Sequence, residues 1–298
     1  MKLRSPRPDD LRETLALLRA FDTDGWGDSD WTEDDLREHW EGLDLGWDAW
    51  IVELDGRIAG YVDVSMRGPR AIADGYVAPD LRGLGVGSAL VEVVERRALE
   101  QAGRVYVHYV ALGESSAPFF AARGYRPVRH QWRMLIELEE APTASVPDGV
   151  EIRPYRPGEE RAIHEAIEEA WADGGWHHRP RTFEEAAPEL FGRERHDASL
   201  CLVALVGGGV AGASLNDWKR NGDWGWIGTL GVRPAYRRRG IAEALLKRSF
   251  AEFFRRGERR VALGVDAQSP TGATRLYERA GMHVLYEVTV YEKELRAA

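Results

Sequence analysis

LGVRPAYRRRGIAEALLKRSF, residues 230–250, predicts the end of a strand, a basic turn with a glycine, and an amphipathic helix. Pro234 has no N–H to donate, so it ends the strand ladder. Ile241, Ala244, Leu245 and Phe250 then recur at helical spacing. The stretch is therefore a strand–turn–helix unit, and the rest of the chain is interpreted around it.

The turn of this unit is suited to bind a phosphate group. The start of a helix leaves backbone N–H groups unpaired and carries a partial positive charge. Gly240 lacks a Cβ, so a ligand can approach the backbone closely. Arg237, Arg238 and Arg239 add positive charge beside it. These features predict a seat for a phosphate or pyrophosphate. The alternative is a solvated basic turn.

A second copy of the unit favours a phosphate-binding site over a solvated basic turn. Residues 77–90 read VAPDLRGLGVGSAL. Arg-x-x-Gly-x-Gly begins at Arg82, and Arg-x-x-Gly-x-Ala begins at Arg237, 155 positions later. Three further segments repeat in the same order: residues 3–8 with 152–157, 50–64 with 200–215, and 119–125 with 276–282. The chain is therefore interpreted as a tandem duplication of one domain.

The repeated pattern resembles the GNAT superfamily of acyl-CoA-dependent N-acetyltransferases. The basic turn resembles the family's pyrophosphate loop, and residues 276–281, LYERAG, resemble its C-terminal helix motif. Among tandem members, the chain is similar in plan to mycothiol synthase. The resemblance implies an α/β fold with α+β layering, in which two tandem domains each have a mixed, mostly antiparallel sheet, flanking helices and a splayed strand pair. The expected domains are residues 1–140 and 151–298, with 141–150 as linker.

The resemblance also implies acetyl-CoA as co-substrate and indicates which residues bind it. Backbone groups of the loop strand pair with the pantetheine arm as an added strand would, and amides of the turn hold the pyrophosphate. In the second copy these residues are Leu230, Val232, Arg237, Arg238, Arg239, Gly240, Ile241, Ala242 and Ser269. In the first copy they are Val77, Arg82, Gly83, Gly85, Val86 and Gly87.

A general acid is expected in the second copy only. Tyr277, four residues before Gly281, has the family position of the group that protonates the leaving thiolate after direct attack by a neutral amine. The first copy has Phe120 there, which has no proton to give. We therefore expect the second copy to be catalytic, and the first to be catalytically degenerate and to bind CoA weakly or structurally. Ser115 or Ser116 is the alternative donor in the first copy.

The sequence does not identify the general base. Many relatives have a glutamate six residues before the loop strand's valine, where this chain has Trp226 and, in the first copy, Ala71. Asp223, at the entrance of the strand, is the first candidate. Asp217, Asp266 or a water relay are the alternatives. A strand N–H near Leu230 is expected to stabilise the oxyanion.

The acceptor is expected to be a primary amine of a small molecule. Residues 22–48 combine many acids with four tryptophans, and this region borders the acceptor site in GNAT domains. It suggests a cationic acceptor, or else a solvated acidic helix with core tryptophans. Asp30, with Glu33 three residues later, predicts the cap of that helix. The alternative functions are a protein or peptide N-terminal acetyltransferase and a non-catalytic CoA-binding protein.

Length and composition support a soluble globular protein of two domains. The 298 residues are 44% hydrophobic and 30% charged, which is typical of globular proteins. No apolar run has the length of a membrane span or signal peptide. The single cysteine, Cys201, excludes an intrachain disulfide framework and favours a cytoplasmic location. A monomer or homodimer is expected.

Two other functions are not favoured. Residues 1–145 contain 17 Lys and Arg against 26 Asp and Glu, an acidic balance that argues against nucleic-acid binding. The pair His177 and His178 lacks a third ligand at suitable spacing, so no metal is expected.

Overall fold

The computed structural model divides into two compact units. Unit 1 comprises residues 1–131 and 286–298, and unit 2 comprises residues 132–285. The structure describes residues 1–29, 31–100, 103–112, 115–172, 180–192, 196–220 and 224–296, with backbone alone at 219 and 220. Within these ranges, no helix is both long and apolar enough to cross a membrane.

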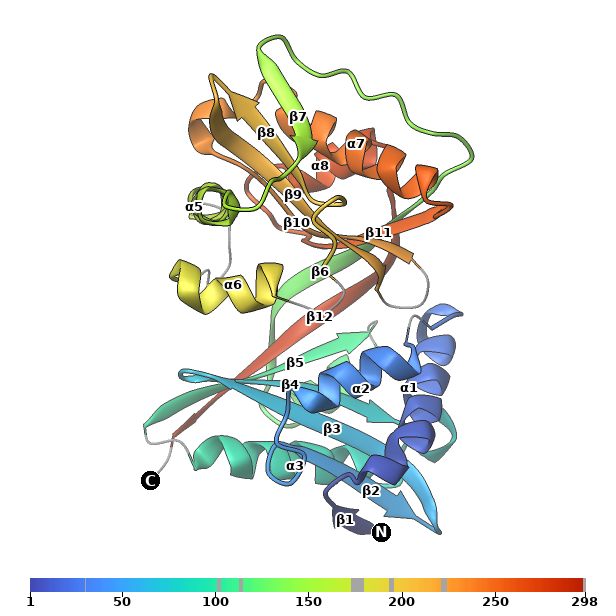
Figure 1. The fold of residues 1–298 in the computed structure, drawn as a ribbon. Coiled ribbons are helices and arrows are strands. Elements are labelled where there is room, and N and C mark those ends of the chain that lie inside the picture. The colour runs from blue at the N-terminus through green and yellow to red at the C-terminus, as the bar shows by residue number, and fades with distance from the viewer. Residues whose placement is uncertain are drawn as a thin grey trace. The chain divides into compact units, whose positions relative to one another are not determined.

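Unit 1 is a sheet with helices on both faces (Figure 1). Its strands follow the order β1-β2-β3-β4-β5-β12, and only β4 and β5 run parallel among the pairs in this unit. The elements are β1 (Lys2–Arg4), η1 (Pro8–Asp10), α1 (Leu11–Trp26), α2 (Glu33–Glu41), β2 (Ala49–Leu54), β3 (Arg57–Arg67), β4 (Arg70–Val77), η2 (Pro79–Leu81), α3 (Val86–Leu99), β5 (Arg104–Leu112), α4 (Ala117–Ala121), the start of β6 (Arg126–Glu137) and the end of β12 (His283–Arg296).

Alternation along the strands gives unit 1 two apolar layers. Residues such as Ala71, Val107 and Tyr109 pack against α3 and α4 on one face. Ile51 and Tyr61 pack against α1 and α2 on the other face. Successive side chains of a strand point to opposite faces of the sheet, so a strand between two layers of helices is buried on both sides.

Unit 2 repeats this plan. Its strands follow the order β6-β11-β10-β9-β8-β7, and β10 and β11 run parallel. The elements are β7 (Val150–Pro154), α5 (Glu160–Trp171), α6 (Phe183–Phe191), β8 (Leu202–Val206), β9 (Gly209–Arg220), β10 (Trp224–Val232), η3 (Pro234–Tyr236), α7 (Ile241–Arg255), β11 (Arg260–Asp266) and α8 (Ala273–Arg279), with the end of β6 and the start of β12. Mixed, mostly antiparallel sheets flanked by helices confirm the expected fold class.

The last strand of each repeat lies partly in the other unit. Val288–Arg296 of β12 pairs antiparallel with Arg104–Leu112 of β5, so the end of the chain completes the sheet of unit 1. From Trp132 onward, β6 belongs to unit 2, where it neighbours β11. The expected division into 1–140, 141–150 and 151–298 describes the sequence repeats and stays a prediction. The two compact units have other bounds, because each includes part of the last strand of the other repeat.

One expected helix cap is wrong. Helix α2 begins at Glu33, and the hydroxyl of Thr32 accepts from the N–H of Asp35 at 3.1 Å. The Asp35 carboxylate accepts from the N–H of Thr32 at 3.2 Å, which completes the capping box. Asp30, the expected cap, lies outside the described residues, and Asp35 rather than Glu33 is the reciprocal partner.

Candidate functional site

Both copies contain a pair of parallel strands that separate. In unit 1, β4 pairs with β5 only from Arg70 to Ala73, opposite Tyr106–Tyr109. In unit 2, β10 pairs with β11 only at Gly225 and Trp226. The other edges of β4 and β10 stay paired with β3 and β9 as far as the valine before the turn. Each copy therefore offers one open backbone edge in the described residues, as expected for an added strand.

A cavity of about 640 Å³ fills the opening in unit 1. Its walls come from β4, β5, α3, α4 and the end of α1. Four predicted cofactor residues line it: Val77, Arg82, Gly83 and Gly87. Ser115, Ser116 and Phe120, which the sequence analysis compared as acid candidates, line it too. The cavity has the size of a small-molecule site.

The first basic turn keeps its helix start open. Gly83 and Gly85 have φ of +79° and +85°, in the left-handed region that favours glycine. Helix α3 starts after Gly85 without a side-chain cap, and a Cβ at Gly85 would meet no atom within 4 Å among the described residues. Val86 is buried in the core, so only its backbone faces a ligand. The turn thus has the free N–H groups that an anion needs.

The second basic turn has the same backbone with different side chains. Gly240 has φ +79° and α7 starts after it without a side-chain cap. Arg238, at φ +61°, adopts the left-handed conformation that Gly83 has in the first copy. Arg238 and Arg239 are exposed. Pro147 lies 3.5 Å from the position of a Cβ on Gly240.

Arg82 and Arg237, which open the two turns, have different contacts. Arg82 is ion-paired with Asp24 at 2.6 Å and lies over the ring of Phe21. Arg237 donates to the carbonyl of Val232 at 3.2 Å and to the carbonyl of Ala170 at 2.7 Å. Arg237 therefore fastens its turn to β10 and α5.

The remaining predicted cofactor residues have structural side-chain contacts. Leu230, Val232, Ile241 and Ala242 pack in or against apolar clusters of unit 2. Val232 and Ile241 are buried, whereas Leu230 and Ala242 are partly exposed. The hydroxyl of Ser269 lies 2.9 Å from that of Thr271, in the segment before α8. The cofactor roles of these residues stay predictions.

Tyr277 lies on α8, which packs against β11, one of the two strands that separate in unit 2. It is 8% exposed and belongs to one cluster with Ile227 of β10 and Leu263 of β11. Burial raises the pKa of Tyr277 to about 12, so the hydroxyl keeps its proton at neutral pH. This placement is compatible with the expected acid.

The base candidates differ in position. Asp223 lies outside the described residues. Asp217 of β9 stands opposite Trp226, and its carboxylate lies 3.5 Å from the position of a Cβ on Gly228, beside a register shift in β10. The carboxylate of Asp266 accepts from the N–H of Gln268, a turn contact. Asp217 is therefore the described candidate nearest the bulge of the loop strand.

Unit 1 contains a polar cluster that the sequence analysis missed. Asp63 of β3 and Asp74 of β4 are directly opposite, and His39 of α2 lies 2.9 Å from the carboxylate of Asp63. These side chains line a cavity of about 20 Å³ with Tyr61 and Tyr76. A signal was present, because Asp63 and Asp74 are equally distant from the turn at residues 68–69 and so pair in the hairpin.

The environment of this cluster raises the pKa of two of its residues, Asp74 and His39. Burial, and then the charge of Asp63, raise the pKa of Asp74 to about 6. Burial lowers the pKa of His39, but the hydrogen bond and charge of Asp63, with the charge of Asp74, raise it above its usual value overall. Asp74 therefore exchanges its proton closer to neutrality than an ordinary aspartate does.

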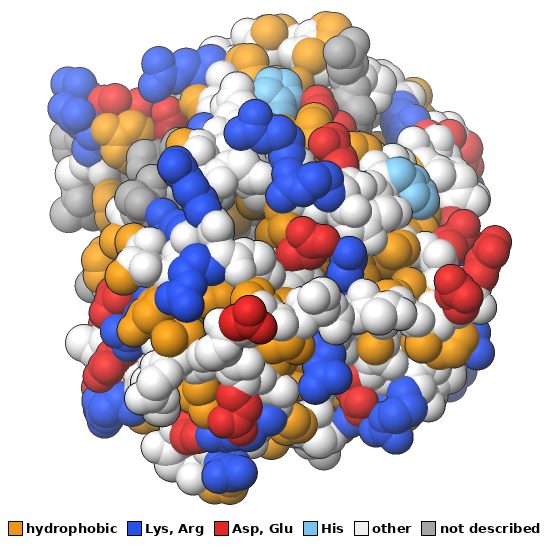
Figure 2. Space-filling view, turned by 90° about the horizontal axis from the view of Figure 1, so that it is seen from above, with side chains coloured by type: hydrophobic (Ala, Val, Ile, Leu, Met, Phe, Trp, Pro, Cys, Tyr) orange, Lys and Arg blue, Asp and Glu red, His pale blue; other side chains and the backbone are white. Residues whose placement is uncertain are grey.

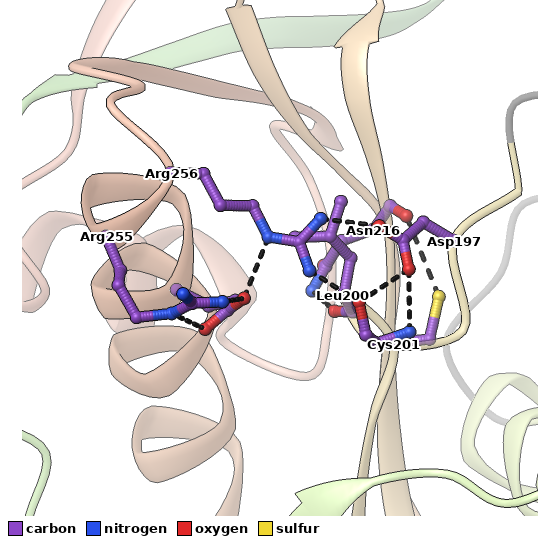
Figure 3. A network of polar contacts seen from close by, with 8 residues as sticks. Asp197, Leu200, Cys201, Asn216, Arg255 and Arg256 are labelled. Carbon is purple, nitrogen blue, oxygen red and sulfur yellow. Dashed lines mark hydrogen bonds and ion pairs between the residues drawn. The ribbon is translucent and has the colours of Figure 1, made fainter.

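Cys201 has a structural role in unit 2. Its thiol donates to the carbonyl of Asn216 at 3.6 Å, and the Asn216 amide donates to Leu200 (Figure 3). Arg256 joins Asp197 to α7 in the same network. Burial raises the pKa of Cys201 to about 12, so the thiol is a poor nucleophile.

Surface charges are mixed on the face in Figure 2. Lys and Arg side chains alternate there with acidic and hydrophobic ones. The described residues on this face therefore present a mixed rather than a uniformly basic surface.

Comparison with known proteins assigns the family. The model of the Acetyltransferase (GNAT) family matches residues 11–125 and 162–282. The chain belongs to the GNAT family of acetyltransferases. It is an acyltransferase enzyme with two GNAT domains, as the repeated turn predicted.

The relatives also support the tandem plan. A mycothiol acetyltransferase of Geodermatophilus obscurus is 30% identical over 92% of this chain and 91% of its own. A GCN5-related N-acetyltransferase from Sphaerobacter thermophilus is 38% identical, with TM-score 0.87 over 99% of this chain and 96% of that one. A tandem GNAT protein from the clavulanic acid pathway, 17% identical, shares the fold with TM-score 0.76 over 98% of each chain. The expected similarity to mycothiol enzymes is confirmed.

Proposed function

We propose that this GNAT protein transfers the acetyl group of acetyl-CoA to a primary amine of a small molecule, with Tyr277 of unit 2 as general acid. The observation that carries the proposal is the place of Tyr277. It belongs to one buried apolar cluster with Ile227 and Leu263, which lie on the two strands that separate beside the basic turn. We infer that the thioester ends beside this cluster when the turn holds the diphosphate.

The residues of the turn fit acetyl-CoA. Gly240 lies in the left-handed region, α7 has no side-chain cap, and Arg238 and Arg239 are exposed beside its first N–H groups. A diphosphate is stabilised by such amides and cations. The unpaired edge of β10 supplies backbone groups for the pantetheine amides. Bound acetyl-CoA supplies an activated thioester.

Each residue then has one task. The Tyr277 hydroxyl keeps its proton and donates it to the leaving sulfur. A backbone N–H near Leu230 stabilises the oxyanion. A carboxylate takes the proton of the incoming ammonium, with Asp223 and Asp217 as the candidates. Asp217 gains support from its place beside the register shift in β10.

Relatives guide the choice of acceptor. One protein named mycothiol acetyltransferase aligns with more than nine tenths of this chain. We infer a small amine of the mycothiol type as the first acceptor to test. Peptide amines form the contrasting group, because they would need an open groove.

The test is release of free thiol from acetyl-CoA across an amine panel. We expect Tyr277→Phe to lower kcat by about 10²-fold or more at the second copy, the usual loss of an acid catalyst. Tyr106→Phe is the control, because Tyr106 contacts Arg104 on an exposed part of β5. Full turnover by Tyr277→Phe would remove Tyr277 from the mechanism. No thiol release with any amine would favour a non-catalytic CoA-binding protein.

A further inference from the structure

We propose that Asn216 is a positioning residue for the reaction of unit 2, because it fixes a bulge in β10 that sets the backbone of the loop strand. The inference rests on the acetyl transfer proposed above for unit 2. It concerns a buried polar cluster to which the sequence analysis gave no role. This serine–asparagine cluster consists of Ser214 and Asn216 of β9 and Ser249 of α7.

The strand β10 has one more residue than β9 in the middle of their pairing. Ile227 stands opposite Asn216. The next pair joins Thr229 to Leu215, so Gly228 is the extra residue. A bulge of this kind bends the strand and increases its twist. It therefore sets the path of β10 between its pairing with β11 and the basic turn.

The bulge also changes the side on which the residues of β10 lie. Ile227 belongs to the apolar cluster with Phe250 of α7, and Leu230, three positions later, packs against the same cluster. In a regular strand, side chains return to one face at every second position. Backbone N–H groups likewise alternate between the two edges of a strand. The bulge therefore decides which N–H groups beyond Gly228 face the open edge.

The equivalent pair of strands in unit 1 has no bulge. The pairing of β3 with β4 runs from Gly60 to Arg67 without a register shift. In unit 1, Val77, the valine before the turn, stands opposite Gly60. In unit 2, Val232 stands opposite Gly212. The two glycines are therefore equivalent, and positions on β3 and β9 can be compared by counting from them.

Unit 1 has valines at the three positions of the serine–asparagine cluster. Two and four residues after the aligned glycine, β3 has valines where β9 has a serine and an asparagine. Eight residues after the first residue of the helix, α3 has a valine where α7 has a serine. The three buried valines are Val62, Val64 and Val94. Within the described residues, the bulge and the polar cluster therefore occur together in unit 2.

Asn216 connects three parts of unit 2. Its side-chain amide donates to the carbonyl of Leu200 at 2.7 Å, as Figure 3 shows, and to the hydroxyl of Ser249 at 2.9 Å. The hydroxyl of Ser214 donates to the amide oxygen of Asn216 at 2.8 Å. Ser249 donates in turn to the carbonyl of Leu245 at 3.0 Å. The cluster therefore joins β9 to the segment before β8 and to α7, the helix that begins at the basic turn.

Unit 1 makes the corresponding contact with its main chain. The N–H of Val64 donates to the carbonyl of Asp48 at 2.9 Å. By the same alignment, Leu200 has the place of Asp48. In unit 2 that carbonyl accepts from the side chain of Asn216. A side-chain amide therefore takes the place of a backbone N–H, at the position opposite the residue before the bulge.

The buried cluster favours one register of β9 against β10. Its three residues are at most 1% exposed. A slip of β9 by one residue would turn the Asn216 side chain to the other face of the sheet, away from Ser249. The donors and acceptors left unpaired in the core would cost about 1–3 kcal/mol each. A satisfied polar network of this kind specifies a single arrangement, whereas valines would tolerate several.

Asn216 acts through the backbone rather than on the substrate. Its side chain lies between β9 and α7, whereas Asp217, the next residue, lies beside Gly228 on the other face. The proposed oxyanion donor is an N–H near Leu230, beyond the bulge. A displacement of about 1 Å at such a donor can cost about 10²-fold in rate. Loss of Asn216 should therefore lower kcat, while the turn at Gly240 still binds the cofactor.

The first test is Asn216→Val, which copies unit 1 at this position and removes the side-chain hydrogen bonds. We expect kcat for thiol release to fall at least 10-fold, with KM for acetyl-CoA and the Kd of CoA within twofold. Val203→Ala, a core change on β8 of the same unit, is the matched control and should leave kcat within twofold. An unchanged kcat in folded Asn216→Val would overturn the proposal.

A double variant tests the same role with less disruption. Ser214→Ala with Ser249→Ala removes two partners of Asn216 and keeps its bond to Leu200. We expect kcat to fall at least 3-fold, again with KM within twofold. This variant decides the question if Asn216→Val does not fold, and an unchanged kcat would then count against the positioning role.

Hydrogen exchange provides a readout without turnover. The backbone N–H groups of residues 227–230 should exchange at least 5-fold faster in Asn216→Val than in the wild type, because the bulge is no longer held. Val203→Ala should leave their exchange within twofold. Equal exchange of this segment in both variants would contradict the proposal.

The outcomes separate this proposal from the proposed function. If the wild type releases no thiol with any amine, the proposed function fails and the catalytic role of Asn216 fails with it. If the wild type is active and Asn216→Val keeps both its kcat and its protection of residues 227–230, the positioning role alone fails.

Discussion

Asp74→Asn should stabilise the protein at neutral pH. The pKa of Asp74 rises from 3.8 to about 6 on folding, by burial and then by the charge of Asp63. About 2 pKa units correspond to about 3 kcal/mol, and partial solvent contact of Asp74 reduces this to roughly 1–2 kcal/mol. Asparagine carries no charge and can donate to Asp63, so the variant avoids this cost.

The difference in stability between Asp74→Asn and the wild type depends on pH. A carboxyl with a raised folded-state pKa favours folding below its unfolded pKa, and this advantage is lost as pH rises through the folded value. Well below pH 3.8, Asp74 is protonated in both states, and at pH 4 the variant and the wild type should differ much less than at pH 7.5. Between pH 4 and 6 the advantage of the variant should grow, and above pH 7 it should be complete.

Urea unfolding at pH 7.5 and pH 4 measures this difference. With a slope of about 2 kcal/mol/M, the midpoint of the variant should rise by roughly 0.5–1 M at pH 7.5. Asp34→Asn, an exposed change on α2, is the control and should shift the midpoint little at either pH. An equal shift at both pH values, or a lower midpoint at pH 7.5, would refute the reasoning on Asp74.

Three further predictions follow from the fold and the turns. A fragment of residues 1–140 lacks the strand that pairs with β5, so it should aggregate or unfold without cooperativity, as light scattering and urea titration would detect. Gly225→Ala should cost about 1–3 kcal/mol in urea unfolding, because its Cβ would lie 2.7 Å from the ring of Phe253; Gly264→Ala, with no described atom within 4 Å, should change stability little. Arg237→Lys should weaken acetyl-CoA binding about 5-fold or more with kcat within twofold, because a lysine cannot bridge the carbonyls of β10 and α5; calorimetry and steady-state rates check both.

The sequence was sufficient to predict the repeated plan of the fold. The two Arg-x-x-Gly turns follow strands, as expected, and β10 ends at Val232, two residues before the Pro234 that was expected to end the ladder. Local chemistry decides such features, since proline ends strands and glycine supplies left-handed turns.

The exchange of the last strands could not be predicted in this way. Residues of β6 and β12 occupy equivalent places in their repeats, so their own pattern fits either sheet. Which of the two strands pairs with β5 depends on long-range packing, and two repeats of similar sequence do not determine that choice.

The polar cluster of unit 1 was predictable in part. Asp63 and Asp74 interrupt apolar strands, and their equal distance from the hairpin turn fixes their pairing. The contribution of His39 comes from α2, and its contact with Asp63 depends on how that helix packs. Strand register is local, but helix placement is not.

The most direct measurement is a structure of the chain with bound acetyl-CoA. The account predicts diphosphate oxygens within about 3 Å of the N–H groups at Gly240–Ala242, and the sulfur beside the Tyr277 hydroxyl. Acetyl-CoA that avoids the turn at Gly240, or a sulfur atom remote from the Tyr277 hydroxyl, would contradict the account.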